Sequence, residues 1–331
     1  MKTITFSGYK TGHVQGIAVD AKREYIYLSF TTCLVKADMS GNVVSTVTGL
    51  AGHLGCIAYN YDDGKVYGSL EFKKDGIGKS ILKKIGRADI EDGFYMTVFD
   101  VDKINRMDMD ACNDGVMKAV YLKEPLVDYL ADGHRYGCSG IDGTTFARLF
   151  GSDDQKNYLY VAYGIYGDVA RTDNDNQVIL RYDISDWDKY ALPLDQDNMH
   201  KSGPAVPDSK YFLFTGNTIY GVQNLEYDPY SDTILAAVYK GEKEQFPNYP
   251  LYFIDCKKSP QENEIFLANI GENNHPSGIC GSNFPHGSTG IASLGNGDFL
   301  VSEDFKNEDG YGTVIKHYRF DKAACTFEEV E

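Results

Sequence analysis

The sequence lacks both a long apolar run and an excess of positive charge. Its 331 residues include 32 Lys and Arg against 48 Asp and Glu, which gives a formal net charge of -16. So acidic a chain repels phosphate backbones and anionic lipid surfaces. No run approaches the roughly 18 to 20 apolar residues of a membrane-spanning helix, and the first ten residues, MKTITFSGYK, have no apolar signal segment. We therefore expect no nucleic-acid partner and no membrane partner.

Paired cysteines are also missing. The seven cysteines are scattered, odd in number and form no C-x-x-C motif. Reduced thiols in a cytoplasm are the simplest interpretation of this pattern. Export, with a leader removed before residue 1, is the alternative.

Long amphipathic helical patterns are scarce, and the stretch 80–90 is the one fair candidate for a helix. Tryptophan occurs once, whereas there are 25 Tyr and 17 Phe. Short runs such as 24–30, 65–72 and 158–165 are rich in β-branched and aromatic residues, which is typical of pleated, half-buried strands. The composition and periodicity together predict an all-β protein.

The stretch TGHVQGIAVD at 11–20 returns in altered form four more times along the chain. Each copy has a His or Tyr, one or two small residues, and then an apolar residue that opens a strand-like run. Tight polar turns follow most copies, for example at 20–23 and 60–64, and predict β-hairpins. We call the apolar residues that open these runs the ring residues: Ile17, Ile57, Ile141, Leu225 and Ile291.

Antiparallel strands that recur in this way are the signature of a β-propeller. The sequence therefore predicts a single-domain β-propeller over residues 1–331 with five four-stranded blades. Six or seven blades are the alternatives, because units two and three are long. The strand at 3–8 is expected to complete the last blade, so that no sheet edge stays open. The first strands of the blades are expected to begin near residues 13, 53, 136, 220 and 286.

In its repeat architecture the chain resembles the bacterial propellers that include the NHL, gluconolactonase-like and lyase types. The resemblance covers the whole chain. It implies the fold and no particular reaction, because propellers host many unrelated functions.

The long, irregular loops should gather on one face of such a ring. They include 73–94 and 193–220, whereas most turns on the opposite face are short, as at 20–23 and 60–64. Binding surfaces are usually built from long loops on a rigid scaffold, so we expect the main pocket on the long-loop face. Three small residues are expected only to let strands crowd at the axis: Gly16, Gly140 and Gly290.

Histidines stand at corresponding places before three of the ring residues. His13, His53 and His286 belong to blades that are neighbours once the ring closes, with Gln15 close by. Three imidazoles and an amide oxygen could hold a divalent metal such as Mn, Zn or Ca. Lyase-type propellers that act on oligogalacturonate have a comparable His and Gln arrangement. The structural alternative is that each imidazole orders the ring through a backbone hydrogen bond.

Carboxylates form a second candidate constellation. Glu71 and Glu303 end the second strands of units two and five, and Asp304 lies beside the latter. Two carboxylates that face each other across a pocket are what glycoside hydrolysis requires. Five-bladed arabinanase-type glycosidases use such carboxylates, although His13 and Gln15 stand here where those enzymes place an Asp. Solvated acids at strand ends are the alternative.

Two classes of function remain open. The first is a hydrolase or lyase that acts on a carbohydrate or another small polar molecule at the channel mouth, and the second is a non-catalytic propeller that binds a ligand or a protein there. The candidate catalytic residues are His13, His53, His286, Glu71 and Glu303. The candidate ligand-binding residues are Gln15, Tyr136, Tyr220, Gln223, Ser288 and Asp304.

Overall fold

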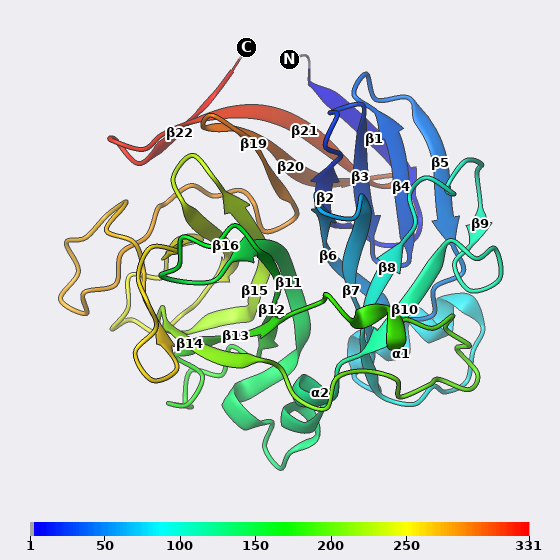
Figure 1. Ribbon diagram of the computed structural model, residues 1–331, viewed down its shortest axis with the longest axis horizontal. Helices are drawn as coiled ribbons and strands as arrows, with labels where there is room; N and C mark the ends of the chain where they lie inside the picture. Colours follow the sequence, from blue (N-terminus) through cyan, green and yellow to red (C-terminus); the bar gives the residue numbers. More distant parts are fainter. Residues whose placement is uncertain (1–2, 331) are drawn as a thin grey trace.

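Five β-sheets surround one axis in the computed structural model, which describes residues 3–330 (Figure 1). The innermost strands of the sheets are β2 (Val14–Val19), β6 (His53–Asn60), β11 (Cys138–Arg148), β15 (Thr218–Asp228) and β19 (Ile291–Gly295). Each ring residue lies in one of these strands, as the repeat predicted. The chain is a five-bladed β-propeller.

Antiparallel hairpins extend every blade outward, as the turn chemistry predicted. The second strands are β3 (Tyr25–Phe30), β7 (Lys65–Phe72), β12 (Asn157–Ile165), β16 (Thr233–Lys240) and β20 (Asp298–Asn307). The third strands are β4 (Cys33–Asp38), β8 (Gly93–Phe99), β13 (Asn176–Tyr182), β17 (Leu251–Asp255) and β21 (Gly310–Asp321).

The outer strands are less regular than the inner three. They are β5 (Val43–Thr48), β10 (Met117–Tyr121), β14 (Ser209–Phe214) and β1 (Ile4–Tyr9), with the short β9 (Met109–Asp110), β18 (Glu264–Ile265) and β22 (Thr326–Glu329). The stretch 264–270 does not form a fourth strand of the fourth blade. β18 pairs in parallel with β14 of the third blade, and only short contacts of 266–268 reach β17. The sheet of the fourth blade therefore has three strands.

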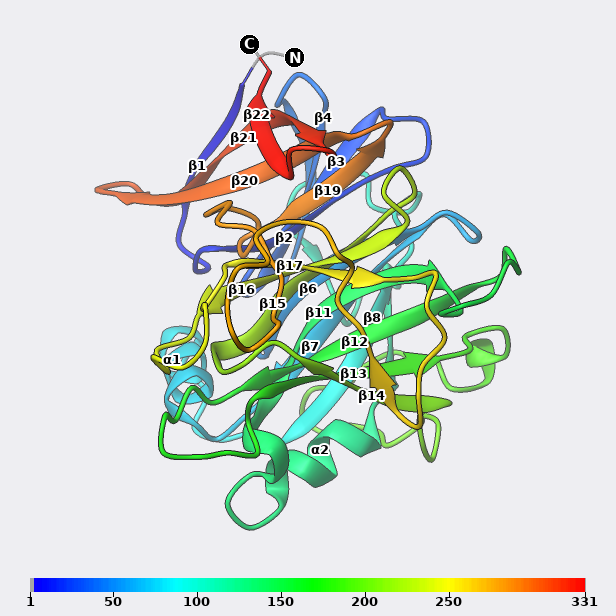
Figure 2. The same ribbon diagram turned by 90° about the vertical axis from the view of Figure 1, so that its left-hand side faces the viewer.

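The N-terminal strand closes the ring. β1 pairs antiparallel with β21, with Ile4 opposite Ile315 and Phe6 opposite Thr313. β1 lies beside β21 in both views (Figures 1 and 2). The strand predicted at 3–8 does complete the last blade, and it covers much of an edge that would otherwise be open.

Phe6→Ala tests this closure, because the side chain of Phe6 is 3% exposed. We expect a loss of about 3 to 5 kcal/mol in the free energy of unfolding, the usual range for a buried Phe→Ala change, measured by urea titration. Thr5→Ala, at the exposed neighbouring position, should change it by less than about 0.5 kcal/mol. Equal effects of the two substitutions would contradict the closure.

Neighbouring inner strands approach so closely at the axis that some positions accept only glycine. A Cβ on Gly16 would lie 2.9 Å from the backbone N of Ile57, and one on Gly290 would lie 3.1 Å from Ile17. Both glycines therefore have the packing role that the sequence predicted. The buried Asn224 then links three blades, because its side-chain amide donates to the carbonyl oxygens of Gln15 at 2.8 Å and Ser288 at 2.9 Å.

The register of the third blade differs from the sequence interpretation. Ile17 pairs with Leu28 and Ile57 pairs with Gly68, each just after a bulge. In β11 the residue at this place is Thr144, which pairs with Val161, while Ile141 lies before the bulge. In the third blade, therefore, Thr144 and not Ile141 occupies the position that corresponds to Ile17. The predicted alignment of this blade with the others was displaced by three residues.

Two α-helices lie outside the sheets among residues 3–330 (Figure 2). α1 (Gly76–Ile85) begins after Asp75, whose side chain accepts a hydrogen bond from Gly78 N at 2.8 Å. It overlaps the helix predicted at 80–90 but begins and ends earlier. α2 (Lys123–Leu130) lies outside 80–90, the one stretch for which a helix was predicted. No described helix is long and apolar enough to cross a membrane.

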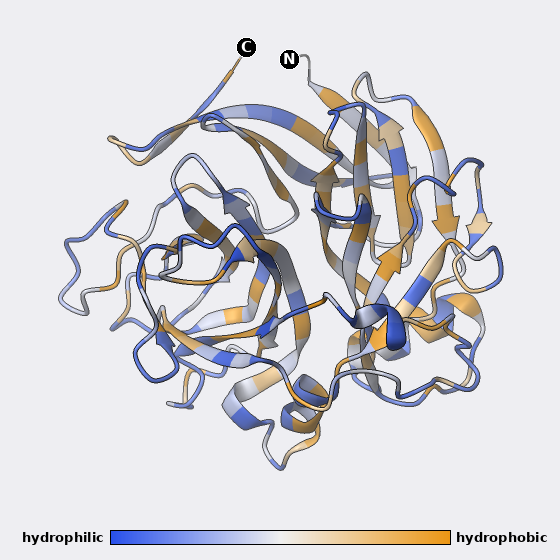
Figure 3. Ribbon diagram, in the orientation of Figure 1, coloured by the Kyte–Doolittle hydropathy of each residue, from blue (hydrophilic) through white to orange (hydrophobic). Residues whose placement is uncertain are grey.

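Apolar residues are concentrated in the strands, whereas hydrophilic residues dominate the peripheral loops (Figure 3). The core consists of side chains packed between neighbouring blades, with large rings such as Tyr27, Phe99 and Tyr160 almost completely buried. Burial of this apolar surface is the main force that holds the blades together.

Candidate functional site

A pocket of about 180 Å³ opens at the long-loop mouth of the channel. Six of the predicted site residues line it: His13, Gln15, His53, Glu71, Tyr220 and Gln223. Four polar residues that the sequence interpretation did not select line it as well: Lys73, Ser139, Asp142 and Tyr239.

A buried ion pair forms one wall of this pocket. The ammonium Nζ of Lys73 lies 2.8 Å from Glu71 Oε2 and donates to the carbonyl oxygen of Ser139 at 2.9 Å. The other oxygen of Glu71 accepts the backbone N–H of Ile141. Burial alone would raise the pKa of Glu71, but Lys73 and His53 more than offset this and hold the pKa below its usual value. Glu71 is therefore a fixed carboxylate at neutral pH.

Gly140 makes room for this carboxylate. A Cβ at residue 140 would lie 1.7 Å from Glu71 Oε1 and 3.0 Å from Lys73 Nζ, and its φ of +148° is a conformation that other residues rarely adopt. Gly140 thus has a different role from the one predicted. It admits the Glu71 side chain, whereas Gly16 and Gly290 admit neighbouring strands.

Gly140→Ala should therefore break the ion pair. Breaking a buried pair costs about 3 to 5 kcal/mol, and we expect a loss of this size in the free energy of unfolding, measured in urea. The control is Gly8→Ala, because Gly8 also has a positive φ (+85°) and a Cβ added there would meet no atom within 4 Å. If Gly8→Ala loses as much stability as Gly140→Ala, backbone strain alone explains the loss, and the ion pair does not contribute to it.

Asp142 is a second carboxyl group in the lining of the pocket. Its side chain is buried, and Oδ1 accepts the backbone N–H of Cys56 at 2.9 Å. Gly55 leaves space for it, since a Cβ there would lie 2.3 Å from Oδ1. Burial raises the pKa of Asp142 to about 7, with the charge of Glu71 adding to the rise and the charge of His53 opposing it. Near neutral pH this carboxyl group can both give and accept a proton.

This raised pKa makes Asp142 destabilising at high pH. Between about pH 4 and pH 7 the folded chain keeps the proton that the unfolded chain has released, so stability falls as pH rises. Asp142→Asn keeps an acceptor for Cys56 N–H without the charge. The free energy of unfolding of this variant, relative to that of the wild type, should rise by about 2 to 3 kcal/mol between pH 5 and pH 8, measured by urea titration. The exposed Asp186→Asn should show no such growth, and an equal pH dependence of both variants would contradict the assignment.

Two histidines, His13 and His53, line the pocket together with Asp142. His53 Nδ1 is buried and lies 3.5 Å from Glu71 Oε2. His13 lies 3.2 Å from the side-chain nitrogen of Gln15. Burial lowers the pKa of His13; the charge of Asp304 opposes this and the charge of His53 adds to it. His13 is therefore a neutral imidazole at neutral pH.

The third predicted histidine is elsewhere. His286 lies 3.5 Å from Glu303 Oε1, and neither residue lines the pocket. Residues 3–330 contain no group of three or more His, Cys, Asp or Glu side chains that could hold a metal ion. The predicted convergence of His13, His53 and His286 at one point is thus not found.

The predicted match between Glu71 and Glu303 is wrong by one residue. Ala58 pairs with Tyr67 and Ala292 pairs with Leu300, so the residue of blade five that corresponds to Glu71 is Asp304. Adjacent residues of a strand point to opposite faces. Glu303 instead accepts a hydrogen bond from Tyr318 at 2.8 Å and lies 3.2 Å from Lys316.

The remaining predicted ligand residues also lie outside the pocket lining. Tyr136 precedes β11 and stacks edge-on against Phe212, with ring centroids 5.1 Å apart. Because the frame of this blade is displaced by three residues, Ser139 takes the place that was expected for Tyr136. Ser288 binds Asn224 through its carbonyl oxygen.

A second and larger cavity, of about 460 Å³, opens at the other mouth of the channel. It is lined by the turn residues Asp20 and Arg23 and by Tyr61. The expectation that the long-loop face holds the main pocket is therefore wrong as to size. Five inner strands diverge at both ends of the channel, so short turns also frame a hollow.

No protein-family model and no curated protein matches this sequence. Similar solved structures include the Dos1 propeller, at 10% identity and a TM-score of 0.35 over 96% of this chain and 57% of that one. The periplasmic gluconolactonase PpgL of Pseudomonas aeruginosa is matched at 10% identity and 0.35 over 96% and 71%. A GH43 β-1,3-galactosidase, BT3683, is matched at 13% identity and 0.43 over 96% and 93%. Scores this low support no argument about function, and the fold rests on the strand pairing of this chain.

Proposed function

We propose that the pocket at the long-loop mouth is the active site of a hydrolase or lyase that acts on a small polar, sugar-like molecule. The observation that carries the proposal is the pair of carboxyl groups whose environments separate their pKa values, since Glu71 stays ionised while Asp142 titrates near neutral pH. A carboxyl group that keeps its proton near neutral pH, beside one that stays ionised, is typical of acid–base sites, in which the protonated group gives the proton.

Asp142 is the proton donor in this proposal. One oxygen is fixed by Cys56 N–H, and the residue lines the pocket. With a pKa of about 7, a large fraction of the group is protonated at neutral pH and can protonate a leaving oxygen.

His53 is the base. In this proposal the proton is on Nδ1, which lies 3.5 Å from Glu71 Oε2, and the lone pair of Nε2 removes a proton from the reacting group. In hydrolysis this proton comes from the attacking water, and in elimination it comes from carbon. Glu71 and Lys73 are positioning residues, because they orient the imidazole and do not themselves exchange protons.

The pocket suits a small ligand with several hydroxyl groups. Its volume equals that of about six water molecules at roughly 30 Å³ each. Gln15, Gln223 and Tyr220 line it, together with His13, whose imidazole is neutral. Such groups form hydrogen bonds with hydroxyls and carbonyls without requiring a charge on the ligand.

The test is turnover of a panel of monosaccharide lactones and nitrophenyl monoglycosides by the full chain. For any compound that the wild type converts, Asp142→Asn should lower kcat by roughly 10² to 10⁴, the usual contribution of a general acid. The wild-type rate should fall as pH rises above about 7, because Asp142 then loses its proton. His53→Gln should lower kcat by a similar factor.

Asp186→Asn, at an exposed site, is the matched control and should keep full turnover. Binding of panel compounds without conversion would favour the alternative, a non-catalytic ligand-binding propeller. Full turnover by Asp142→Asn would overturn the assignment of the acid.

A further inference from the structure

We infer that the cavity at the short-turn mouth is a second binding site, and that its ligand is a small organic cation, an amine or quaternary ammonium. Its volume of about 460 Å³ is in the range of small-molecule sites, which is roughly 300 to 1,000 Å³. The inference does not depend on the chemistry at the other mouth, because the two linings share no residue.

A carboxyl group without a counter-ion is the first observation. Glu226, on β15, lines the cavity, and Oε1 accepts the backbone N–H of Ser293 at 2.7 Å. Among residues 3–330 no Lys, Arg or His side chain forms an ion pair with it. A carboxylate removed from bulk water is normally paired. Once the group is ionised, above about pH 8, a cation from outside this part of the chain can supply the missing partner.

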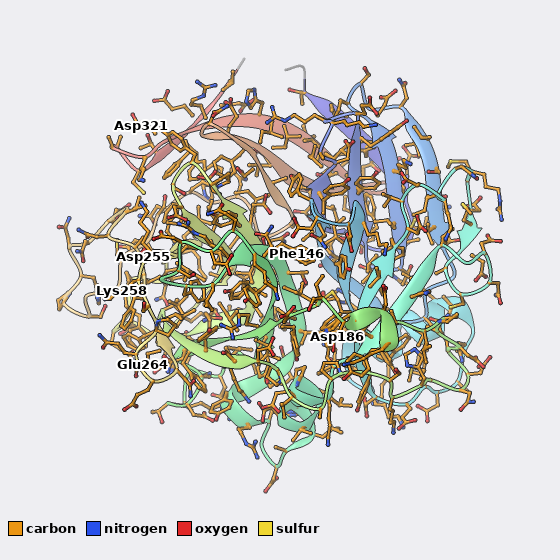
Figure 4. All side chains as sticks on the ribbon, viewed as in Figure 1. Phe146, Asp186, Asp255, Lys258, Glu264 and Asp321 are labelled. Atoms are coloured by element: carbon orange, nitrogen blue, oxygen red, sulfur yellow. The ribbon has the colours of Figure 1, made fainter. Side chains whose placement is uncertain are left out.

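Aromatic rings supply the second observation. Tyr59, Tyr61, Tyr227 and Phe146 line the same cavity. Tyr59 and Tyr61 meet edge to face with centroids 5.1 Å apart, and Phe146 lies near the centre of the ring of blades (Figure 4). Aromatic faces around an acid are the chemistry that recognises organic ammonium groups through cation–π attraction.

The charges around the cavity favour the same ligand. Asp20, from the first blade, directs its carboxylate to the amides of its own turn, which fixes the turn and leaves a negative charge there. Asp228 lies two residues beyond Glu226 on the same strand. The one cation in the lining, Arg23, donates to the carbonyl oxygen of Leu294. When Glu226 is ionised the lining has two carboxylates, Asp20 and Glu226, against the single cation Arg23, and the net charge of -16 on the chain acts in the same sense, so a cation is attracted to this mouth.

Proton linkage gives the site a measurable signature. Burial raises the pKa of Glu226 to about 8, with the charge of Asp228 adding to the rise and Ser293 N–H opposing it. The other titratable groups that face the cavity are Asp20, Arg23, Tyr59, Tyr61 and Tyr227. A cation binds the ionised carboxylate, so below pH 8 it must displace the proton. Affinity should therefore rise with pH up to about 8 and then level off.

The experiment is calorimetric titration of the full chain with choline and with dimethylbutanol, its neutral isostere in which carbon replaces nitrogen. We expect choline to bind with a Kd in the millimolar range or below at pH 9, and about 100-fold more weakly at pH 6, since each pH unit below the pKa weakens binding tenfold. At pH 7 each bound choline should release close to one proton, seen as a heat that changes with the buffer. Dimethylbutanol should bind at least tenfold more weakly than choline at pH 9.

Glu226→Gln keeps an acceptor for Ser293 N–H and is neutral, as Glu226 itself is at pH 6, so it should fold. It should lose at least tenfold in choline affinity at pH 9 together with the pH dependence and the proton release. The matched control, Glu264→Gln, changes an exposed residue at the periphery and should keep all three (Figure 4). No choline binding at pH 9, equal binding of the neutral isostere, or full binding by Glu226→Gln would each overturn the inference.

Discussion

Closing five twisted sheets into a ring forces their innermost strands to approach one axis, and the other features of this molecule depend on that constraint. Asn224 shows it most directly, because one side-chain amide donates to carbonyl oxygens of the first and fifth blades. Buried backbone groups at the axis need such partners. Away from this level the strands diverge, since each sheet is twisted. A hollow at each mouth is therefore a consequence of closure, and the side chains there are free to differ between blades.

The pocket at the long-loop mouth arises from a repeated irregularity of the inner strands. In four blades the pairing between the first and second strands shifts its register at a bulge just before the position of Ile17. The residue two positions before that place lies in the bulge, and it is Gln15, Gly55, Asp142 or Gln223. Three of these side chains line the pocket, and Gly55 leaves the space that Asp142 occupies. Bulges commonly re-aim side chains next to functional sites. The backbone thus repeats while the chemistry changes from blade to blade.

The sequence predicted the blades well, because hydrophobic runs, polar turns and the five copies of one pattern are local features. It failed where the answer depends on pairing between strands. Ile141 was aligned with Ile17 because both are apolar, although the pairing places the polar Thr144 there. Alignment of Gly143 with Gly16 would have placed Asp142 beside Gln15.

The other errors in the site have the same origin. Glu303 and Asp304 are adjacent acids, and only the register shows that Asp304 corresponds to Glu71. The helix α2 was missed because it has eight residues and contains Pro125, which weakens a helical pattern in the sequence. Short local signals cannot show which face of a sheet a residue takes.

The repeats themselves provide an internal control for the role of Glu226 and Asp142. Glu226 pairs with Leu235 at a level where the corresponding residues of the other blades are Ala18, Ala58, Thr145 and Ala292. A small residue therefore satisfies the fold at this position. Burial raises the pKa of Glu226 to about 8, which means that the folded chain opposes its ionisation, and the same holds for Asp142 at the other mouth. A blade can be built without an acid at the position of Glu226, and both acids oppose folding above neutral pH. The roles that we propose for Glu226 and Asp142 therefore lie in ligand contacts at the two mouths of the channel.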